Sequence, residues 1–525
     1  MHEWRSSLRA ANAAFTPIGL AAAIFALLAL SGPGRIDIVD GQTRYEVSRS
    51  IVEHGDVQIR NPDVWFGVFP GRDGQSHTYY RFPQSLAGVP ALLIADLAGR
   101  RSEPRRHFLF VLCSAAAASL LAVVYLYWFL STGLSRRKAV YWATAGILCT
   151  PAWFYGTSAF DDIFGAVAVT SAVALAIGTR ASGSHLPALL AGLLIGLAFN
   201  CKQPLGIFAL AVLAACDIPT VPRRERLQNA AVVSLGVLAG LVLYVAFDLW
   251  KFPPGIKDQH AELLKEYFPV FTEFSWIAPL ALAFSPAAGA LWYFPPVLLC
   301  VAGLRQFVRR ERVVSAALLI SVSVFVAVIC AISFFKGDPA WGPRYLTPVF
   351  AIVWLFAPAG AARFRRSETV TLLLLGAFVQ VAALTVDPYR LYIQRGLPST
   401  FGAIAPALYF DPANSHLLTR PREVMEIWEA RREHGVAFTP WPTPTSTVTI
   451  LDRVELGQTA INRYKVLNSF RPWWASHWYM AIDDRPVHIG TTAAALALLG
   501  VVGVGMTLMG LRTAERRRCG AAASR

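Results

Sequence analysis

An apolar run meets two aspartates in residues 14–40, AFTPIGLAAAIFALLALSGPGRIDIVD. Crossing a hydrocarbon core of roughly 30 Å takes about 20 apolar residues, and the run 14–31 is close to that length. It follows a basic N-terminal segment, as a secretory signal would, but no small-residue cleavage site is evident after it. We therefore expect an uncleaved first span, with Asp37 and Asp40 at its mouth.

The composition of the whole chain indicates that lipid is its main solvent. Of 525 residues, 55% are hydrophobic and only 15% are charged, and the mean hydropathy is +0.46. Soluble domains usually carry about 25% charged residues. Because apolar runs of spanning length recur from end to end, we predict an all-α polytopic membrane protein.

The excess of basic residues and the positions of the cysteines also fit a membrane protein. A net charge of +15 in a soluble protein would suggest a nucleic-acid partner. Here the basic residues gather in short loops between apolar runs, as the positive-inside rule describes, so we expect no nucleic acid. None of the seven cysteines lies in a long polar segment, which leaves no disulfide framework or zinc spacing. We expect them to be packing residues.

Five clusters of basic residues set the predicted topology, at 136–138, 223–226, 305–312, 363–366 and 512–518. Cytoplasmic placement of every cluster requires an even number of crossings between successive clusters. About twelve spans satisfy this with both termini in the cytoplasm, namely 14–31, 108–131, 139–157, 163–179, 186–201, 205–218, 229–248, 286–304, 313–335, 345–360, 368–386 and 487–511. Run 205–218 is short enough to be tilted or partly re-entrant.

Three polar regions then face outward, at 32–107, 249–285 and 387–485. The apolar stretch 84–99 inside the first region is too short to span comfortably, so we predict an interfacial helix there. That helix leaves four arginines outside, against the positive-inside rule: Arg100, Arg101, Arg105 and Arg106. A span at 84–99 would instead invert every later basic cluster, which is a larger conflict.

The chain accordingly divides into three parts. Residues 1–386 form the predicted transmembrane catalytic module, and residues 387–485 form a small mixed outer segment. In that segment, STVTILDRVEL at 446–456 is typical of a short strand. Residues 486–525 hold the last span and a basic cytoplasmic tail.

Asp40 precedes a predicted helix that runs from about Gln42 to His54 and ends at Gly55, a residue suited to the left-handed conformation beyond a helix. The plainer interpretation is that Asp40 caps this helix and that Asp37 is a solvated loop carboxylate. The alternative is that one of them acts as a general base at the membrane surface.

A second candidate stretch is FKGDPAWGPRYLTP, residues 335–348, which brings Lys336, Asp338, Trp341 and Arg344 to another predicted membrane mouth. Its Gly-Pro pair predicts a turn that holds Arg344 in place. A fixed guanidinium suits a phosphate, because its fork donates two parallel hydrogen bonds. The plainer alternative is a snorkelling arginine that anchors a helix end.

Three further outer hairpins carry candidate residues. AFNCKQPLG places Lys202 between two apolar runs, and SAFDDIFG places Asp161 and Asp162 at a hairpin tip. SHTYYRFPQS sets Tyr80 and Arg81 directly before the interfacial segment. Each has a plainer role, as a solvated loop charge, a helix cap or a headgroup-level anchor.

Taken together, these carboxylates and cations converge on one membrane face. The combination predicts transfer chemistry on a lipid-linked phosphate, with a carboxylate as base toward an acceptor hydroxyl. The cations would stabilise charge on the departing phosphate. The sequence contains no Gly-rich nucleotide-phosphate loop, no H-E-x-x-H and no G-x-S-x-G. No predicted cytoplasmic segment is large enough for a nucleotide-sugar domain.

The chain resembles the class C (GT-C) integral-membrane glycosyltransferases, in particular bacterial relatives with a W-G-P-R-Y turn. The resemblance is spread over most of the membrane region. Its most specific parts are FSPAAGALWYFPPVLLCVAGL and WGPRYLTP, and its other parts are DGQTRYEVSRSIVEHGD, YYRFPQSLAGVPALLIADLAG and LAGLLIGLAFNCKQP.

The resemblance implies a polyprenyl-phosphate sugar as donor, used on the periplasmic or extracellular face of the cytoplasmic membrane. It assigns the base to Asp40, with Asp37 in reserve, and implies inversion at the anomeric carbon. Arg81 and Arg344 fall where relatives carry basic residues, with Lys202 and Tyr80 as further candidates at the donor phosphate.

The remaining assignments concern the acceptor and cofactors. The acceptor would be an envelope lipid, glycan or protein, and its site would be shaped by Asp161, Asp162, Trp341 and Asp338. No cofactor is required, although Asp37 and Asp40 could hold a divalent cation. The motif here is DIVDG rather than an adjacent acidic pair, and Gln203 separates Lys202 from the proline.

Two other classes of protein stay open on the sequence. A transporter or flippase of lipid-linked sugars would place ionisable residues and broken helices near the bilayer midplane. The polar groups of this chain gather instead at one membrane mouth, which favours an enzyme. A structural partner in an envelope-assembly complex is a third class.

Overall fold

The computed structural model describes residues 2–62, 64, 67–97, 103–179, 185–217, 221–253, 275–332, 335–337, 340–395, 406–434, 470–476 and 487–523. The described chain is almost entirely helical, as predicted. Within the described residues, six helices are long and apolar enough to cross a membrane: α1 (His2–Ser31), α4 (Glu103–Ser131), α10 (Arg223–Lys251), α15 (Arg312–Cys330), α18 (Arg366–Thr385) and α24 (Val487–Ala523).

The other six predicted spans take shorter forms. Three are short apolar helices: α7 (Asp162–Thr179), α8 (Leu186–Cys201), and the pair η1 (Gln203–Phe208) and α9 (Ala209–Cys216). Three are interrupted: α5 (Arg136–Leu148) with α6 (Ala152–Tyr155), α13 (Ala290–Tyr293) with α14 (Val297–Arg310), and η2 (Arg344–Leu346) with α16 (Thr347–Trp354) and α17 (Ala357–Ala361). The total of twelve crossings therefore stays a prediction.

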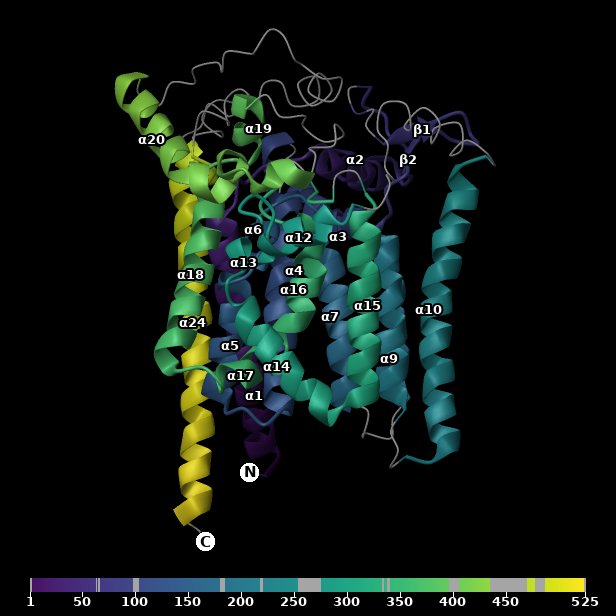
Figure 1. Ribbon diagram of the computed structural model, residues 1–525, viewed down its shortest axis with the longest axis vertical. Coiled ribbons are helices and arrows are strands. Elements are labelled where there is room, and N and C mark those ends of the chain that lie inside the picture. The colour runs from purple at the N-terminus through teal and green to yellow at the C-terminus, as the bar shows by residue number, and fades with distance from the viewer. Residues whose placement is uncertain are drawn as a thin grey trace.

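Both termini lie at one end of the molecule, and the polar elements lie at the other (Figure 1). The first polar region holds α2 (Val39–His54), strands β1 (Val68–Pro70) and β2 (Ser76–Thr78), and α3 (Pro83–Leu97). The strands form one antiparallel hairpin in which Phe69 is opposite His77. Helix α3 corresponds to the predicted interfacial segment, and at 15 residues it is about 22 Å long, too short to cross alone.

The segment 387–485 is described only in part, and its described elements are mainly helical. They are α19 (Tyr389–Arg395), η3 (Pro406–Phe410), η4 (Pro412–Asn414), α20 (His416–His434) and α22 (Trp473–Ser476). The strand predicted at 446–456 lies outside the described residues. In the region 249–285, α12 (Ile277–Phe284) is described.

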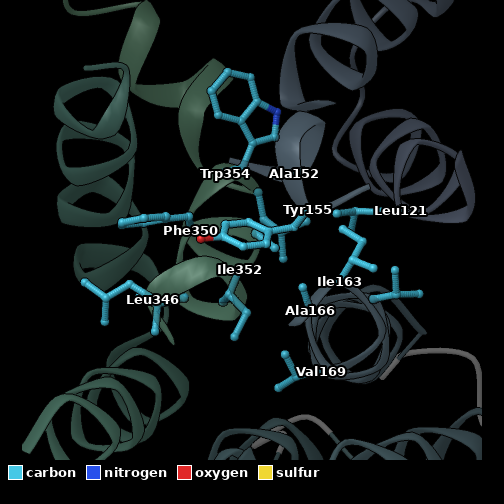
Figure 2. Close-up of a cluster of buried hydrophobic side chains, with 14 of the residues drawn as sticks. Leu121, Ala152, Tyr155, Ile163, Ala166, Val169, Leu346, Phe350, Ile352 and Trp354 are labelled. Atoms are coloured by element: carbon cyan, nitrogen blue, oxygen red, sulfur yellow. The ribbon is translucent and has the colours of Figure 1, made fainter. Parts of the chain in front are cut away.

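Aromatic and aliphatic side chains fill the centre of the helical layer (Figure 2). Tyr155 of α6 is fully buried, and its hydroxyl donates to the backbone carbonyl of Trp341 at 2.7 Å. The indole of Trp354 in α16 donates to the carbonyl of Trp142 at 3.0 Å. These bonds satisfy the polar ends of buried rings, and they fix the chain around Trp341 against the core.

Two helix pairs pack through glycines, which is common where lipid removes the hydrophobic drive for association. A Cβ added at Gly240 of α10 would overlap the Cα of Gly196 in α8. In the same way, a Cβ at Gly19 of α1 would lie 2.6 Å from the carbonyl oxygen of Gly503 in α24. The first and last predicted spans are therefore neighbours.

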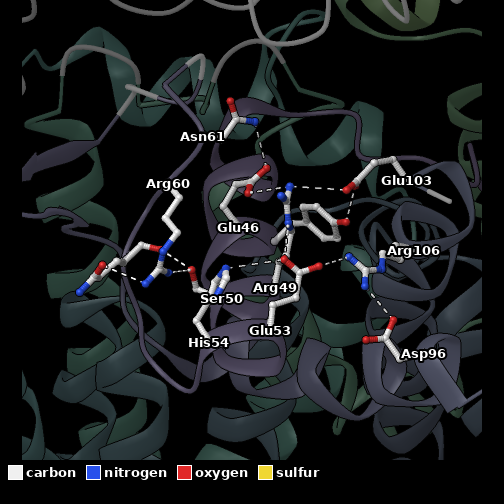
Figure 3. Close-up of polar contacts among 12 residues, drawn as sticks. Glu46, Arg49, Ser50, Glu53, His54, Arg60, Asn61, Asp96, Glu103 and Arg106 are labelled. Atoms are coloured by element: carbon white, nitrogen blue, oxygen red, sulfur yellow. Dashed lines mark hydrogen bonds and ion pairs between the residues drawn. The ribbon is translucent and has the colours of Figure 1, made fainter. Parts of the chain in front are cut away.

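An ion network joins α2 to α3 and α4 (Figure 3). Arg106 donates to Asp96 at 2.7 Å and is also paired with Glu53, which accepts from Arg49 at 3.1 Å. The carboxylates of Glu53 and Asp96 thus neutralise the charge of Arg106. Arg106 is one of the four arginines whose predicted outer position conflicted with the positive-inside rule. Arg100 and Arg101 lie outside the described residues.

Candidate functional site

Helix α2 places Asp40 in its first turn. The helix begins at Val39, and its N-cap residue is Ile38, which makes no side-chain capping bond. The interpretation of Asp40 as the cap is therefore wrong, because the helix starts earlier than the polar pattern suggests. The predicted end is confirmed: Gly55 has a φ of 74° and its N–H bonds to the carbonyl of Ile51.

The Asp40 carboxylate contacts groups from two distant parts of the chain. The Tyr80 hydroxyl donates to Oδ1 at 2.5 Å, and Nη2 of Arg344 lies 3.6 Å from Oδ2. Burial and the nearby Asp40 charge raise the pKa of Tyr80 well above its ordinary value, so this hydroxyl keeps its proton. Asp40 therefore faces a neutral donor on one side and a cation on the other.

Four more residues complete or adjoin this contact. Arg344 Nε donates to Oδ2 of Asp162 at 2.9 Å, and Lys202 is ion-paired with Asp162 and lies 3.7 Å from Asp161. Arg44 Nη2 donates to Asp161 at 2.8 Å. We call the connected set the central ion cluster: Asp40, Arg44, Asp161, Asp162, Lys202 and Arg344.

The local fold explains how the cations are held. Gly342, with a φ of 60°, packs against the Tyr293 ring where a Cβ would clash, so the turn before Arg344 requires glycine. The Arg344 N–H bonds to the carbonyl of Lys336 at 2.9 Å, and its guanidinium lies over the Phe160 ring at 4.2 Å. Lys202 has extended backbone between α8 and η1.

The cluster contains three cations and three carboxylates, largely buried. Burial disfavours the charge of Arg44, but Asp161 and Asp40 outweigh that effect and raise its pKa. Burial likewise opposes ionisation of Asp161, yet Arg44, Lys202 and Arg344 hold its pKa below the ordinary value. Both groups are therefore ionised, and each stabilises the other's charge in a low-dielectric site.

Two members of the cluster are partly exposed. The side chains of Asp40 and Lys202 are each 17% exposed, whereas the other four range from 0% to 8%. Nη1 of Arg44 and Oδ1 of Asp161 are buried without a hydrogen-bond partner among the described residues. The cluster therefore retains unused hydrogen-bonding capacity beside its most exposed carboxylate and amine.

Asp37 has a different environment. Ser158 Oγ lies 2.7 and 2.9 Å from its two oxygens, the Ala159 N–H donates at 2.9 Å, and Arg471 donates at 3.1 Å. Arg471 also donates to Thr157 at 3.0 Å. Asp37 thus joins the segment after α1 to the loop before α7 and to the segment 470–476.

Two other sequence candidates, Arg81 and Trp341, lie apart from the cluster. Arg81 makes a two-pronged ion pair with Asp248 of α10, with 2.6 Å between Nη2 and Oδ2, and lies over the Tyr244 ring. The Trp341 ring packs against Tyr293 and His416. Asp338 lies outside the described residues.

Sequence reasoning missed Arg44 and Arg471. Arg44 carries a usable signal, because it follows Asp40 by four residues and so lies on the same face of α2. Arg471 carries none, because it lies 434 residues from Asp37. Its place in the site depends on the tertiary fold alone.

The residues do not fit a divalent cation at Asp37 and Asp40. Both oxygens of Asp37 accept from hydroxyl, amide or guanidinium donors, and those of Asp40 face Tyr80 and Arg344. Within the described ranges, no three His, Cys, Asp or Glu side chains are grouped as metal ligands.

Comparison with known proteins gives a distant structural likeness. No family model matches the chain, and no curated protein matches it. One solved structure with a similar chain path is the archaeal oligosaccharyltransferase AglB from Archaeoglobus fulgidus, in complex with an inhibitory peptide and a dolichol-phosphate. The identity is 14% and the TM-score 0.37, and the match covers 82% of this chain and 60% of that one. A likeness at this level carries no argument about activity.

Proposed function

We propose that the chain is a membrane glycosyltransferase. It moves a sugar from a polyprenyl-phosphate donor to a hydroxyl of an envelope lipid, glycan or protein, on the outer face of the cytoplasmic membrane. One observation carries the proposal: Asp40, the most exposed carboxylate of the central ion cluster, lies 3.6 Å from the Arg344 guanidinium. A base and a phosphate-binding cation therefore share one site.

The transfer step uses Asp40 as general base. Asp40 accepts the proton of the acceptor hydroxyl while that oxygen attacks the anomeric carbon of the donor sugar. The bond between the anomeric carbon and the phosphate oxygen breaks, and the polyprenyl phosphate leaves with the electron pair. Attack from the side opposite the leaving group inverts the anomeric centre.

The cations of the cluster stabilise the leaving phosphate. Lys202 is the partly exposed cation, and Nη1 of Arg44 is a buried donor without an acceptor among the described residues. Arg344 supplies a guanidinium already oriented by Asp162. A phosphate oxygen placed between these groups would use hydrogen-bonding capacity that the cluster retains, and Asp161 and Asp162 keep the cations in place.

Tyr80, Arg81 and Asp37 have positioning roles in this proposal. Tyr80 orients the Asp40 carboxylate through its hydrogen bond. Arg81 would have to leave Asp248 to bind a phosphate, so we assign it to holding the Tyr80 segment against α10. Asp37 is enclosed by donors and does not face an acceptor hydroxyl.

The test is transfer of radiolabel. The full chain is reconstituted in liposomes with polyprenyl-phosphate sugars that carry labelled sugar, and an acceptor membrane extract is added. Asp40→Asn should reduce transfer to background, because an amide cannot take the proton. Asp73→Asn is the matched control, since Asp73 is 47% exposed in the β1–β2 connection, and it should keep full activity.

Two outcomes would overturn the proposal. Full activity in Asp40→Asn would remove Asp40 as the base. Movement of intact labelled donor across the bilayer, with no label on any acceptor, would indicate a flippase instead.

A further inference from the structure

A second group of buried polar side chains lies on α20, at the end of the molecule opposite both termini (Figure 1). His416, Arg420 and Glu423 follow one another at intervals of four and three residues, so they share one face of this helix. All three are buried. They face Trp341 and Tyr293 of two other segments, and we call these five residues the α20 cluster.

Ring contacts and one ion pair hold the α20 cluster together. The guanidinium of Arg420 lies 5.1 Å from the centre of the Trp341 ring, and its Nη1 lies 3.2 Å from Oε2 of Glu423. The rings of Trp341 and His416 are 6.0 Å apart, and those of Tyr293 and Trp341 are 5.3 Å apart. The side chains are therefore fixed next to one another.

Several hydrogen-bonding atoms of the α20 cluster lack partners among the described residues. Apart from the Arg420–Glu423 ion pair, they are Trp341 Nε1, both ring nitrogens of His416, Nε and Nη2 of Arg420 and Oε1 of Glu423. Each buried polar atom left unpaired costs about 1–3 kcal/mol. So many in one place indicate a bound molecule that supplies their partners.

The chemistry of the cluster selects the kind of molecule. Arg420 and Trp341 only donate hydrogen bonds, whereas Glu423 accepts them. Burial, together with Lys336 and Arg420, holds the pKa of His416 well below its ordinary value, so the neutral ring both donates and accepts. An inorganic anion would leave Glu423 opposed by like charge. A molecule with several hydroxyls satisfies donors and acceptors at once.

The α20 cluster is connected to the central ion cluster through one turn. Trp341 belongs to the first, and Arg344, three residues later, belongs to the second. The Tyr155 hydroxyl holds the carbonyl of Trp341, and the Tyr155 ring packs on Phe160 beneath Arg344. A molecule bound at the α20 cluster would therefore contact the same turn that supports the proposed phosphate site.

We propose that the α20 cluster binds a saccharide portion of the acceptor. The inference rests on the proposed transferase function and narrows it, because a lipid or protein acceptor without sugars would not use these groups. Glu423 and Arg420 would bond to ring hydroxyls, and Trp341 would donate to a hydroxyl through Nε1.

Direct binding tests the inference without requiring catalysis. The full chain in nanodiscs is titrated with uncharged trisaccharides of glucose, mannose, galactose and N-acetylglucosamine, and binding is measured by saturation-transfer NMR. At least one probe should bind saturably, and inorganic phosphate should not displace it. Asp40→Asn should bind the same probe unchanged, because Asp40 belongs to the other cluster.

Variants of the α20 cluster locate the binding. Glu423→Gln and Trp341→Phe should each raise the Kd of the saccharide by about tenfold, the effect of losing a hydrogen bond to a buried partner. Trp341→Phe keeps the Arg420–Glu423 pair, so it stays informative if Glu423→Gln does not fold. The matched controls on the same helix are Glu429→Gln and Trp428→Phe, both exposed, and they should stay within twofold.

The outcomes separate the two proposals. Saturable binding that is lost in the cluster variants, with no label transfer from any donor, would support the saccharide site and overturn the transferase. Label transfer with no saturable saccharide binding, or with binding that Trp341→Phe and Glu423→Gln leave unchanged, would overturn the saccharide site alone. Displacement by phosphate would make the cluster an anion site and would also overturn it.

Discussion

At the scale of single residues, Asp37 and Asp40 show how environment divides two identical side chains. They lie three residues apart, but Asp40 keeps part of its carboxylate exposed beside Arg344. Asp37 is enclosed by Ser158, Ala159 and the buried Arg471. A general base needs a lone pair that a substrate can reach, and only Asp40 meets this condition.

Substitution of the two aspartates should therefore have different effects on the thermal stability of the protein. Asp37→Asn leaves the buried charge of Arg471 without its carboxylate, and breaking such a pair costs about 3–5 kcal/mol. We expect a clear fall in the Tm of the protein in detergent, measured by tryptophan fluorescence. Asp40→Asn should lower the Tm much less, because its carboxylate is partly hydrated. An equal fall in both variants would contradict the assignment.

The sequence was sufficient for part of the site. Charged residues at predicted loop ends pointed to Asp40, Lys202, Arg344, Asp161 and Asp162, and the structure brings these together. The pattern could not separate Asp40 from Asp37, because their difference arises from partners at 158 and 471. It also gave no signal for the pairing of Arg81 with Asp248, which was counted as part of a span.

At the scale of elements, hydropathy located the apolar segments but not their breaks. The run 286–304 contains Pro295 and Pro296, and the helix is interrupted there between α13 and α14. Proline has no N–H for a helix interior, so this break had a signal in the sequence. The ends of α2 differ in the same way: Gly55 marks the end clearly, whereas no capping side chain marks its start.

The glycine contact between α8 and α10 gives a prediction at this scale. Gly240→Ala puts a methyl group into the backbone of α8 at Gly196, which should cost about 1–3 kcal/mol through separation of the helices. The Tm in detergent should fall accordingly. Gly505→Ala in α24 is the control, because nothing lies within 4 Å of its added Cβ, and it should leave the Tm unchanged or slightly raised.

The ion network of α2 predicts a pH dependence. Burial alone would raise the pKa of Glu53, but hydrogen bonds from Arg106 and Arg49 hold it below its ordinary value. A depressed pKa means that this carboxylate stabilises the fold above about pH 4.3, its unfolded value, and that the stabilisation is lost as pH falls through the folded pKa.

Glu53→Gln should therefore lower the Tm by about 1 °C at pH 7, because about 1 kcal/mol is spread over the unfolding entropy of a chain of 525 residues. The difference from the wild type should shrink as the pH is lowered below 4. Glu429→Gln, at an exposed position, serves as the control and should show no difference at either pH. A gap that persists at low pH would count against an electrostatic origin.

At the scale of the whole molecule, ion pairs join segments that lie hundreds of residues apart. Arg35 donates to Asp387 at 3.0 Å across 352 residues, and Arg471 reaches Asp37 across 434. Both pairs tie the segment 387–485 to the segment after α1. One sequence carries no signal for such pairings, because each partner alone is an ordinary loop charge. The alternation of apolar runs and basic loops, in contrast, was enough to predict the helical layer.

The last prediction concerns the orientation of the helical layer in the membrane, because the proposed donor would be used on the outer face only. Helix α20 and the N-terminal end of α10 lie at opposite ends of the molecule (Figure 1). In a variant without native cysteines, a membrane-impermeant maleimide should label Arg422→Cys, whose parent side chain is 83% exposed, in intact cells. Arg224→Cys should react only after permeabilisation, because basic loops stay cytoplasmic. The reverse labelling would place the central ion cluster on the cytoplasmic side, where the topology gives an outward-facing donor no access to Asp40.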